Sequence, residues 1–305
     1  MRRPRALGAQ DVIALVAPSG RYAMERVREA EAGIAADGWR ARRMLPASFG
    51  KSADYLAGPD ARRAATFERA WKDPKLAMLW AVRGGFGAAR TLDHLKAARL
   101  RKADPKILAG YSDITALLNW TAQELGTICF HAPNAAGLYS GDAATKRSFK
   151  KIVTGEIGKG GELARGLKAA HAGKAEGRLA GGNLIVLSSL VGTPYEVDLA
   201  GKVLFVEDIN EAPYCLDRAV TQLVQASNFA KIRALLLGTF TGPGNKRLAA
   251  KKILPLFAER LPKKTPVLYG LKVGHVGTNL TMPIGARVRV DSRSGALTLL
   301  ENVVR

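Results

Sequence analysis

The strongest fold signal in this sequence is the stretch Lys106-Ile107-Leu108-Ala109-Gly110-Tyr111-Ser112-Asp113-Ile114-Thr115. A short apolar run ends at Gly110, and a pattern of apolar residues with helical spacing follows. This pattern predicts a strand, a tight turn and a helix, with the hydroxyl of Ser112 pushed out of the sheet. The backbone amide after the serine then lies at a helix N-terminus, where free N–H groups favour developing negative charge.

Two interpretations of Ser112 follow from this stretch. Nucleophile elbows place a serine on such a strand-to-helix turn, although the full G-x-S-x-G pattern is not met because Ile114 occupies the position of the second glycine. A serine before a helix is also a common helix cap. On this stretch alone, the cap is the favoured interpretation.

The flanking sequence extends the strand and helix pattern in both directions. Residues 12–17 and 76–82 form apolar runs typical of strands buried on both faces. Helices are expected over 24–37, 60–71 and 88–98, and a strand is expected over 39–45. Strands that alternate with helices through short loops predict an α/β fold with a doubly wound, mainly parallel sheet. Ligands bind such sheets at the carboxyl ends of the strands, where Ser112, His131 and the loop 84–87 all lie.

The composition changes between residues 141 and 176, where Lys, Gly, Ala and Thr dominate. A short helix near 146–154 is the one periodic feature there. We therefore predict an N-terminal domain over 1–140, a linker over 141–176 and a C-terminal domain over 177–305. In the last part we expect strands at 202–208 and 234–238, helices at 216–226 and up to 259, and a β-rich tail.

The charge of this 305-residue chain is unusual, because 47 Lys and Arg face 26 Asp and Glu, for a formal net charge of +21. Such a field attracts anions, including nucleic acids. The basic residues are spread along the chain without a base-reading motif, so a solvated basic surface is the favoured interpretation. No apolar run is long enough to cross a bilayer. The two cysteines, Cys129 and Cys215, suggest neither disulfides nor a metal cluster, and we expect a cytoplasmic protein.

The residues that can carry chemistry lie in separate parts of the chain. His275 lies in a Gly-flanked loop and is the best candidate for a general base by elimination, and His131 is the second. Glu207 and Asp208 end a buried-looking strand, from which a carboxylate can orient a histidine; they can equally cap the next turn or pair with an arginine. The order Ser, Glu, His along the chain is that of the α/β-hydrolases, although order alone is weak evidence.

The segment Arg83-Gly84-Gly85-Phe86-Gly87 resembles a phosphate-binding loop only loosely. No Walker motif is present, and we prefer a role for its amides as donors to an oxyanion or a carboxylate. No H-E-x-x-H or C-x-x-C spacing occurs, so we expect neither a catalytic metal nor another cofactor.

Several stretches together resemble one family, the LD-carboxypeptidases of serine peptidase family S66 (muramoyltetrapeptide carboxypeptidases). They occur in the family's order and cover nearly the whole chain: 16–19, 55–58, 83–87, 110–115, 181–184, 192–194, 205–208, 213–218 and 274–285. The sequence departs from the family pattern at Ala132, where a glycine usually precedes the proline.

The resemblance implies a catalytic triad of Ser112, His275 and Glu207. It also implies a Rossmann-like N-terminal domain (flavodoxin-like or glutamine-amidotransferase-like), a smaller β-rich C-terminal domain, a homodimer and an active site between the domains. The expected substrate is a small muropeptide whose terminal D-Ala is attached to the L-centre of a diamino acid. We expect the amides of Asp113 and Gly85 to stabilise the oxyanion, and Arg83 to bind the terminal carboxylate.

Two alternatives remain open at this point. A relative within the same family, an immunity peptidase that cleaves acylated aminoacyl-adenylate antibiotics, would use the same triad, and the positive charge suits its phosphate. A non-enzymatic basic protein that binds nucleic acid would show steeply salt-dependent binding that is indifferent to Ser112. The lack of a base-reading motif makes the second alternative the weaker one.

Overall fold

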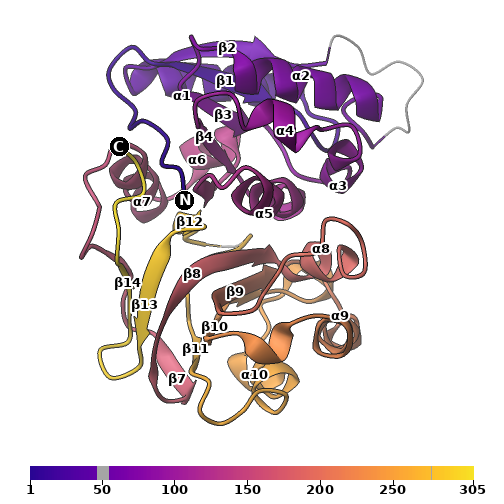
Figure 1. Cartoon of the computed structure of the whole chain (residues 1–305), viewed down its shortest axis with the longest axis vertical. Coiled ribbons are helices and arrows are strands. Elements are labelled where there is room, and N and C mark those ends of the chain that lie inside the picture. The colour runs from indigo at the N-terminus through magenta and orange to yellow at the C-terminus, as the bar shows by residue number, and fades with distance from the viewer. Residues whose placement is uncertain (47–54, 276) are drawn as a thin grey trace.

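The computed structural model describes residues 1–46, 55–275 and 277–305. Within these residues the named strands form two sheets, one above the other in Figure 1. The upper sheet is built mainly from the first 131 residues, and the lower sheet from residues after 162. This arrangement confirms the predicted α/β fold with a Rossmann-like N-terminal part and a β-rich C-terminal part.

The first sheet has the strand order β12-β5-β4-β3-β1-β2. Its strands are β1 (Val12–Val16), β2 (Arg40–Met44), β3 (Met78–Ala81), β4 (Ile107–Gly110), β5 (Cys129–His131) and β12 (Met282–Ile284). β1 to β5 pair in parallel, whereas β12 joins β5 antiparallel. The order 2-1-3-4-5 is that of flavodoxin-like sheets, in which ligands bind where the strand order reverses, between β1 and β3.

The helices of this part are α1 (Met24–Ala36), α2 (Asp60–Lys72), α3 (Ala88–Leu92), α4 (Ala97–Leu100), α5 (Thr115–Glu124) and α6 (Ala135–Ser140). Contacts divide them into two sets: α1 packs on α6, and α2 packs on α3 and α4. The prediction of a single helix over 88–98 is wrong. The chain forms the two short helices α3 and α4 instead, and the extended backbone of Lys96 (φ −114°, ψ 101°) before α4 lets both Leu95 and Leu100 be buried.

The second sheet has the order β6-β14-β13-β8-β9-β10-β11-β7. Its strands are β6 (Glu162–Ala164), β7 (Lys168–His171), β8 (Lys174–Asn183), β9 (Lys202–Asp208), β10 (Ala234–Phe240), β11 (Val267–Tyr269), β13 (Arg287–Asp291) and β14 (Ala296–Leu299). β8 to β11 are parallel, and antiparallel strands flank them on both sides. The helices α8 (Leu184–Ser189), α9 (Pro213–Ala226) and α10 (Ala250–Ala258) share an apolar core with β9 and β10.

The segment 141–176 contains more regular structure than its composition predicts. It holds the helix α7 (Ala143–Val153), the strands β6 and β7, and the start of β8. β6 pairs with β14 and β7 pairs with β11, so both strands belong to the second sheet. The division into domains that end at 140 and begin at 177 stays a proposal. The segment 141–176, however, contains regular secondary structure rather than an extended linker.

The two sheets are joined by α5, which begins just after Ser112. The buried side chain of Asn119 donates to the carbonyl of Gly181 (2.9 Å) and accepts from the amide of Gly181 (3.3 Å). The amide of Asn183 donates to Thr115 Oγ1 (3.0 Å). The N-terminus of α5 is therefore fixed directly against the end of β8.

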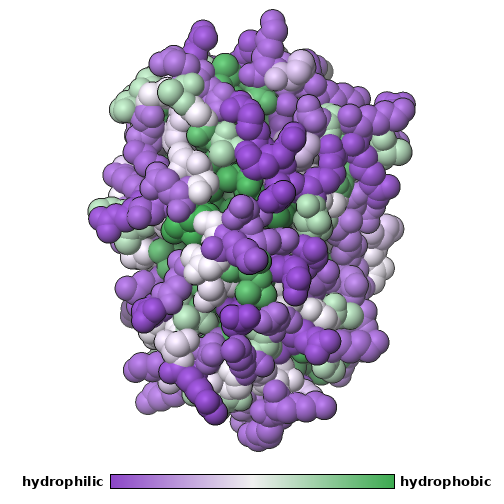
Figure 2. All heavy atoms as spheres, turned by 60° about the vertical axis from the view of Figure 1, so that its left-hand side comes forward, coloured by the Kyte–Doolittle hydropathy of each residue, from purple (hydrophilic) through white to green (hydrophobic). Residues whose placement is uncertain are grey.

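The surface is mostly hydrophilic on the face that Figure 2 shows. The hydrophobic residues on this face form narrow patches along the middle. Among the described residues, no helix combines the length and apolar character needed to cross a membrane.

Candidate active site

Ser112 lies on a strained turn between β4 and α5. Its φ of 64° places a non-glycine residue in the left-handed region, which costs of the order of 1–3 kcal/mol and is common at functional sites. A one-turn 3₁₀ helix, Ser112–Ile114, leads into α5. Tyr111 and Ile114 occupy the two N-cap positions and neither makes a side-chain cap. The helix-cap interpretation of Ser112 is therefore wrong, and the backbone has the strain expected of a nucleophile elbow.

The glycine loop after β3 lies against this serine. A Cβ added at Gly84 would lie 2.9 Å from Ser112 Cβ and 3.0 Å from its Oγ. The amide of Gly20, after β1, donates to the carbonyl of Gly84 (3.0 Å). Gly85 follows with a φ of 104°. The loops after β1, β3 and β4 thus meet at Ser112, at the strand ends where the sequence predicts a site.

Asp113 is buried and connects these three loops. Its carboxylate accepts hydrogen bonds from the hydroxyl of Ser19 and from the amide of Ala88 (2.7 Å). Burial raises the pKa of Asp113, and these hydrogen bonds and the charge of Arg63 oppose the rise. Asp113 therefore holds the start of α3, and with it the glycine loop, against the turn that carries Ser112.

Arg63, which lies on α2, also holds these loops together. Its side chain is almost fully buried, and its guanidinium donates to the carbonyls of Pro18, Gly58 (3.1 Å) and Gly87 (2.7 Å). An arginine offers several donors in a fixed plane, so a single side chain can satisfy carbonyls from separate loops.

Glu207 and His275 form a second cluster, at the carboxyl end of β9. His275 Nδ1 lies 2.8 Å from Glu207 Oε2, and the carboxylate is fully buried. A Cβ at Gly274 would lie 3.2 Å from Glu207 Oε2, and one at Gly238 would lie 3.1 Å from Glu207 Cβ. Close approach of the His275 loop therefore depends on glycine at both positions.

The electrostatics of this pair favour an ionised carboxylate. Burial acts to raise the pKa of Glu207, but the interactions with His131 and His275, which include the hydrogen bond with His275 and the charges of both histidines, outweigh it and lower the pKa to about 2. A carboxylate that stays ionised holds the Nδ1–H tautomer of His275, which leaves Nε2 free to accept a proton.

His275 faces the serine turn through Tyr111. The rings of Tyr111 and His275 lie 4.6 Å apart between centroids, and Tyr111 directly precedes Ser112. Burial, followed by the charge of Glu207, raises the pKa of Tyr111 to about 12. The structure therefore brings together the regions of Ser112, Glu207 and His275, which are far apart in the sequence.

Helix α7 anchors the loop that carries His275. Thr278 Oγ1 donates to the carboxylate of Asp142 (2.5 Å), and the amides of Asn279 and Thr281 donate to Thr145 (3.0 Å) and Ser148 (3.1 Å). Asp142 also caps α7 by accepting from the amide of Thr145 (2.7 Å). The position of His275 therefore depends on a helix from the segment expected to be a linker.

The other histidines differ in their surroundings. His131, at the end of β5, is fully buried, with Nε2 3.9 Å from Glu207 Oε1. His94 is exposed, and His171 is buried in β7. Since His131 is closed off from solvent behind Glu207, His275 is the better placed general-base candidate.

Arg83 lines a cavity of about 290 Å³ together with Tyr111, Asn134 and Arg26. Its guanidinium donates to the carbonyl of Arg21 (2.5 Å). Within residues 1–46, 55–275 and 277–305, Arg83 forms no ion pair with a carboxylate, whereas Arg26 pairs with Glu29 (2.5 Å).

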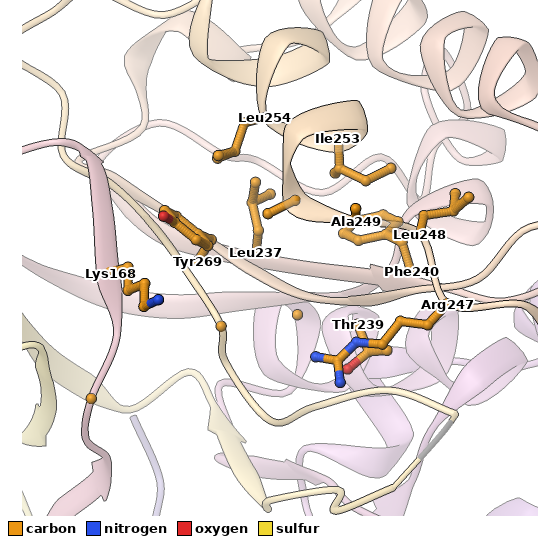
Figure 3. A pocket seen from close by; sticks show the side chains of 14 residues that line it. Lys168, Leu237, Thr239, Phe240, Arg247, Leu248, Ala249, Ile253, Leu254 and Tyr269 are labelled. Carbon is orange, nitrogen blue, oxygen red and sulfur yellow. The ribbon is translucent and has the colours of Figure 1, made fainter.

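A larger cavity, of about 490 Å³, lies at the carboxyl ends of β10 and β11 (Figure 3). Lys168 and Arg247 extend into it from opposite sides, over apolar residues of β10 and α10 and the ring of Tyr269. Gly238 and Thr239 form part of its wall, and a Cβ at either Gly238 or Gly274 would crowd the Glu207 region behind that wall. This cavity adjoins the candidate site but contains neither Ser112 nor His275.

Family models match two parts of the chain. Residues 13–132 match the LD-carboxypeptidase N-terminal domain, and residues 176–290 match the LD-carboxypeptidase C-terminal domain. A probable murein peptide carboxypeptidase of Bacillus subtilis (strain 168) is 31% identical over 297 residues, which are 95% of this chain and 92% of that protein. The chain belongs to the LD-carboxypeptidase family.

Solved structures share the fold over almost the whole chain. A muramoyltetrapeptide carboxypeptidase from Oxalobacter formigenes is 27% identical with a TM-score of 0.79, covering 94% of this chain and 97% of that one. The microcin C7 self-immunity protein MccF, in complex with aspartyl sulfamoyl adenosine, is 24% identical with a TM-score of 0.85, covering 100% of both chains. At that identity the second likeness shows the fold alone.

Several residues that build the site of this LD-carboxypeptidase family member are not predicted from the sequence. Arg63 and Asp142 lie outside the stretches that resemble the family, and Ser19 and Tyr111 lie inside such stretches without an expected role of their own. A weak signal exists for Asp142, since an aspartate three residues before Thr145 is an N-cap pattern. Its contact with the His275 loop spans 136 residues and depends on tertiary structure alone.

Proposed function

We propose that this protein is a cytoplasmic serine carboxypeptidase that hydrolyses the L,D-amide bond of murein tetrapeptides and releases the terminal D-Ala. The observation that carries the proposal is the pairing of His275 with a buried carboxylate next to a serine held at positive φ. The family assignment supports the reaction class, and the names of the relatives support the substrate.

The proposed mechanism assigns one role to each of three side chains. Ser112 Oγ attacks the amide carbonyl while His275 Nε2 accepts its proton, and His275 then protonates the leaving amine of D-Ala as the C–N bond breaks. Water, deprotonated by the same imidazole, hydrolyses the acyl-enzyme. Glu207 fixes the tautomer of His275 and stabilises the imidazolium that forms in each half-reaction.

The oxyanion of the tetrahedral intermediate needs hydrogen-bond donors beside Ser112. We assign this role to the amides of Asp113, at the start of the helical turn, and Gly85, next to the glycine that contacts Ser112. Loss of one such donor typically costs roughly 3 kcal/mol in the transition state.

Arg83 is proposed to bind the terminal carboxylate of D-Ala. It lines the cavity beside Tyr111, and a guanidinium matches the geometry of a carboxylate. Arg83→Ala is expected to raise KM at least tenfold, since a hydrogen bond to a charged group is worth about 1.5–3 kcal/mol. Arg26→Ala is the matched control, because Arg26 lines the same cavity but is already paired with Glu29. Equal KM values for the two variants would refute the assignment.

We also propose that the protein is a homodimer, as the family resemblance implies. Sedimentation or light scattering of the purified protein tests this directly. A monomer at micromolar concentration would refute the assembly without affecting the assignment of the three side chains.

The decisive experiment measures release of free D-Ala from purified murein tetrapeptide by the wild type and by Ser112→Ala. We expect release by the wild type and a loss of at least a thousandfold in the variant, because loss of a triad nucleophile leaves only binding and oxyanion stabilisation. Release that survives the substitution would refute the role of Ser112. A wild type that releases no D-Ala would refute the substrate.

A second candidate function keeps the same side chains but cleaves an acylated aminoacyl-adenylate. The observation that favours it is the larger cavity, where Lys168 and Arg247 offer two cations beside an aromatic ring. Turnover of such an adenylate that falls in the Lys168→Ala/Arg247→Ala variant, while tetrapeptide turnover is absent in the wild type, would support this candidate over the first.

A further inference from the structure

Two buried polar groups without partners face each other behind the proposed site. Both ring nitrogens of His131 and the Oε1 atom of Glu207 lack hydrogen-bond partners among the described residues, and both side chains are fully buried. His131 Nε2 lies 3.9 Å from Glu207 Oε1. Buried polar groups are rarely left unpaired because of the cost in stability, so these two groups require a structural explanation.

We propose that His131 is a positioning residue for Glu207, whose second oxygen it holds with Nε2–H while the first oxygen holds His275. The carboxylate then stands between two imidazoles, one buried and one facing the serine. This proposal deepens the proposed function, on which it rests, because it assigns a role in the same site to a residue that does not touch substrate.

The position of His131 is set by the backbone of the first sheet. His131 pairs with Gly110 of β4 on one side and with Met282 of β12 on the other. The amide of Ala132 donates to the carbonyl of Gly110 (3.0 Å). Because Gly110 lies two residues before Ser112, the sheet fixes the buried imidazole relative to the serine turn.

Aromatic walls direct the ring of His131 toward Glu207. Phe205 of β9 contacts it edge-on with 5.2 Å between centroids, and Tyr111 lies edge-on at 6.0 Å. The ring of His131 thus has the titratable groups of Glu207 and Tyr111 and the apolar ring of Phe205 beside it. A closure of about 1 Å brings Nε2 and Oε1 to the distance of a normal N–H···O bond.

Removal of this donor has a defined electrostatic consequence. Without His131, the negative charge of Glu207 is shared by one hydrogen bond instead of two, and Oε2 becomes a stronger partner for the imidazolium of His275. The protonated form of His275 is therefore favoured in the variant, because the less shared negative charge of Glu207 stabilises the imidazolium. Since the reaction needs neutral His275, the acidic limb of the kcat/KM profile moves to higher pH.

The test compares His131→Phe, which keeps the ring shape without nitrogen, with His131→Gln, which retains a donor near the position of Nε2. We expect His131→Phe to lower kcat about 10- to 100-fold with KM unchanged, as expected for loss of a hydrogen bond to a charged group. We expect its acidic limb to move up by at least half a pH unit, and His131→Gln to recover most of both effects. An unchanged kcat and an unchanged acidic limb in His131→Phe would overturn the proposal.

His171→Phe is the matched control. His171 is also a buried histidine with an unpartnered ring nitrogen, but it lies on β7, at the edge of the second sheet. We expect this variant to lose stability without a shift in the pH profile. A shift of equal size in both variants would assign the effect to general destabilisation and overturn the proposal.

A second measurement needs no folded variant and no substrate. The ¹⁵N shifts of the histidine rings in the intact wild type report which nitrogen of His131 carries a proton. A protonated Nε2 supports the proposal, and an unprotonated Nε2 overturns it even if the phenylalanine variant fails to fold.

Labelling of Ser112 by a fluorophosphonate separates this proposal from the choice of substrate. If the wild type releases no D-Ala, the pH dependence of labelling replaces that of kcat/KM. A higher acidic limb in His131→Phe then supports the role of His131 although the tetrapeptide assignment has failed. An identical limb in both proteins overturns that role.

Discussion

At the scale of single residues, the site depends on the absence of a side chain at Gly84. Gly84 has no positive φ that requires glycine, yet a Cβ there would contact both Cβ and Oγ of Ser112. Space for the hydroxyl of Ser112, the proposed nucleophile, rather than backbone freedom, therefore explains the glycine at this position.

Gly84→Ala is expected to lower kcat by at least a hundredfold, because a misplacement of the nucleophile by about 1 Å has an effect of that size. The measurement is tetrapeptide turnover, or labelling of Ser112, alongside the thermal midpoint. Gly8→Ala is the control, since the nearest atom to a Cβ there is 3.7 Å away. Equal activity of the two variants would contradict the crowding argument.

Glu207 gives a pH dependence with a definite sign. Its pKa in the folded protein is about 2, below its ordinary value of 4.5. The ionised group therefore contributes stability above about pH 4.5, and this contribution is lost as the pH falls toward 2. The difference in free energy of unfolding between wild type and Glu207→Gln should be constant above about pH 5 and shrink at lower pH. A difference that grows on acidification would show the opposite sign of shift.

At this scale, the sequence predicts which residues carry chemistry better than it predicts the contacts that those residues make. Ser112, Glu207 and His275 stand out by residue type and by their places at strand ends or in a glycine-rich loop. The orphaned nitrogens of His131 cannot be predicted, because they depend on side chains of Phe205 and Tyr111 that approach from other strands. Whether a histidine is exposed to solvent or buried depends on the tertiary packing around it.

At the scale of elements, helix α7 holds the loop of His275 through its own N-cap. Hydrogen bonds, first that from Thr278, lower the pKa of the exposed Asp142 to about 2, so this carboxylate is ionised at any working pH. One side chain therefore both begins a helix and anchors a loop from the other end of the chain.

Asp142→Ala should lower the free energy of unfolding by about 1 kcal/mol, the usual cost of a lost cap. It should also lower kcat, because the loop with His275 loses an anchor. Asp142→Asn keeps an acceptor for the amide of Thr145, and its side-chain NH2 donates to Thr278 Oγ1 instead of accepting from it, so this variant should restore most of both quantities. Urea unfolding and turnover measure the two effects, and a stability loss without any loss of turnover would contradict the anchoring role.

Short elements are also where sequence patterns are least informative. β6 and β7 have three and four residues, and most of the side chains of β7 are exposed. They therefore lack the apolar run or alternation that predicts a strand. The strands β1, β3, β9 and β10 contain continuous apolar runs and show that signal clearly, which is why their order and approximate bounds follow from the sequence.

At the scale of the whole molecule, the side chain of Asn119 makes the hydrogen bonds to β8 that a neighbouring strand would otherwise make. Its amide pairs with both the N–H and the C=O of Gly181 at the end of β8. The proposed triad has members on both sheets, so its geometry depends on this junction. Gln123, on the same helix, also bonds to the second half, at the backbone of Glu196 and Asp198, but is exposed.

Asn119→Ala is expected to lower the free energy of unfolding by about 2–3 kcal/mol, since it leaves buried backbone groups of Gly181 unpaired. Gln123→Ala should cost less than about 1 kcal/mol, because water replaces its lost partners. Denaturation followed by two probes, one in each half, measures both values. Similar small losses in the two variants would mean that burial at this junction is unimportant.

The strand β12 gives the molecule a particular order of assembly. It comes from residues 282–284 yet completes the first sheet beside β5, whose outer edge has no other strand partner among the described residues. On the ribosome, the amino-terminal sheet emerges with that edge bare until almost all of the chain has been synthesised. An open edge invites pairing with other chains. A polypeptide released early would thus lack both the proposed general base, His275, and the strand that covers this edge. It would reach the cell's proteases as an aggregation-prone fragment without the proposed hydrolase activity.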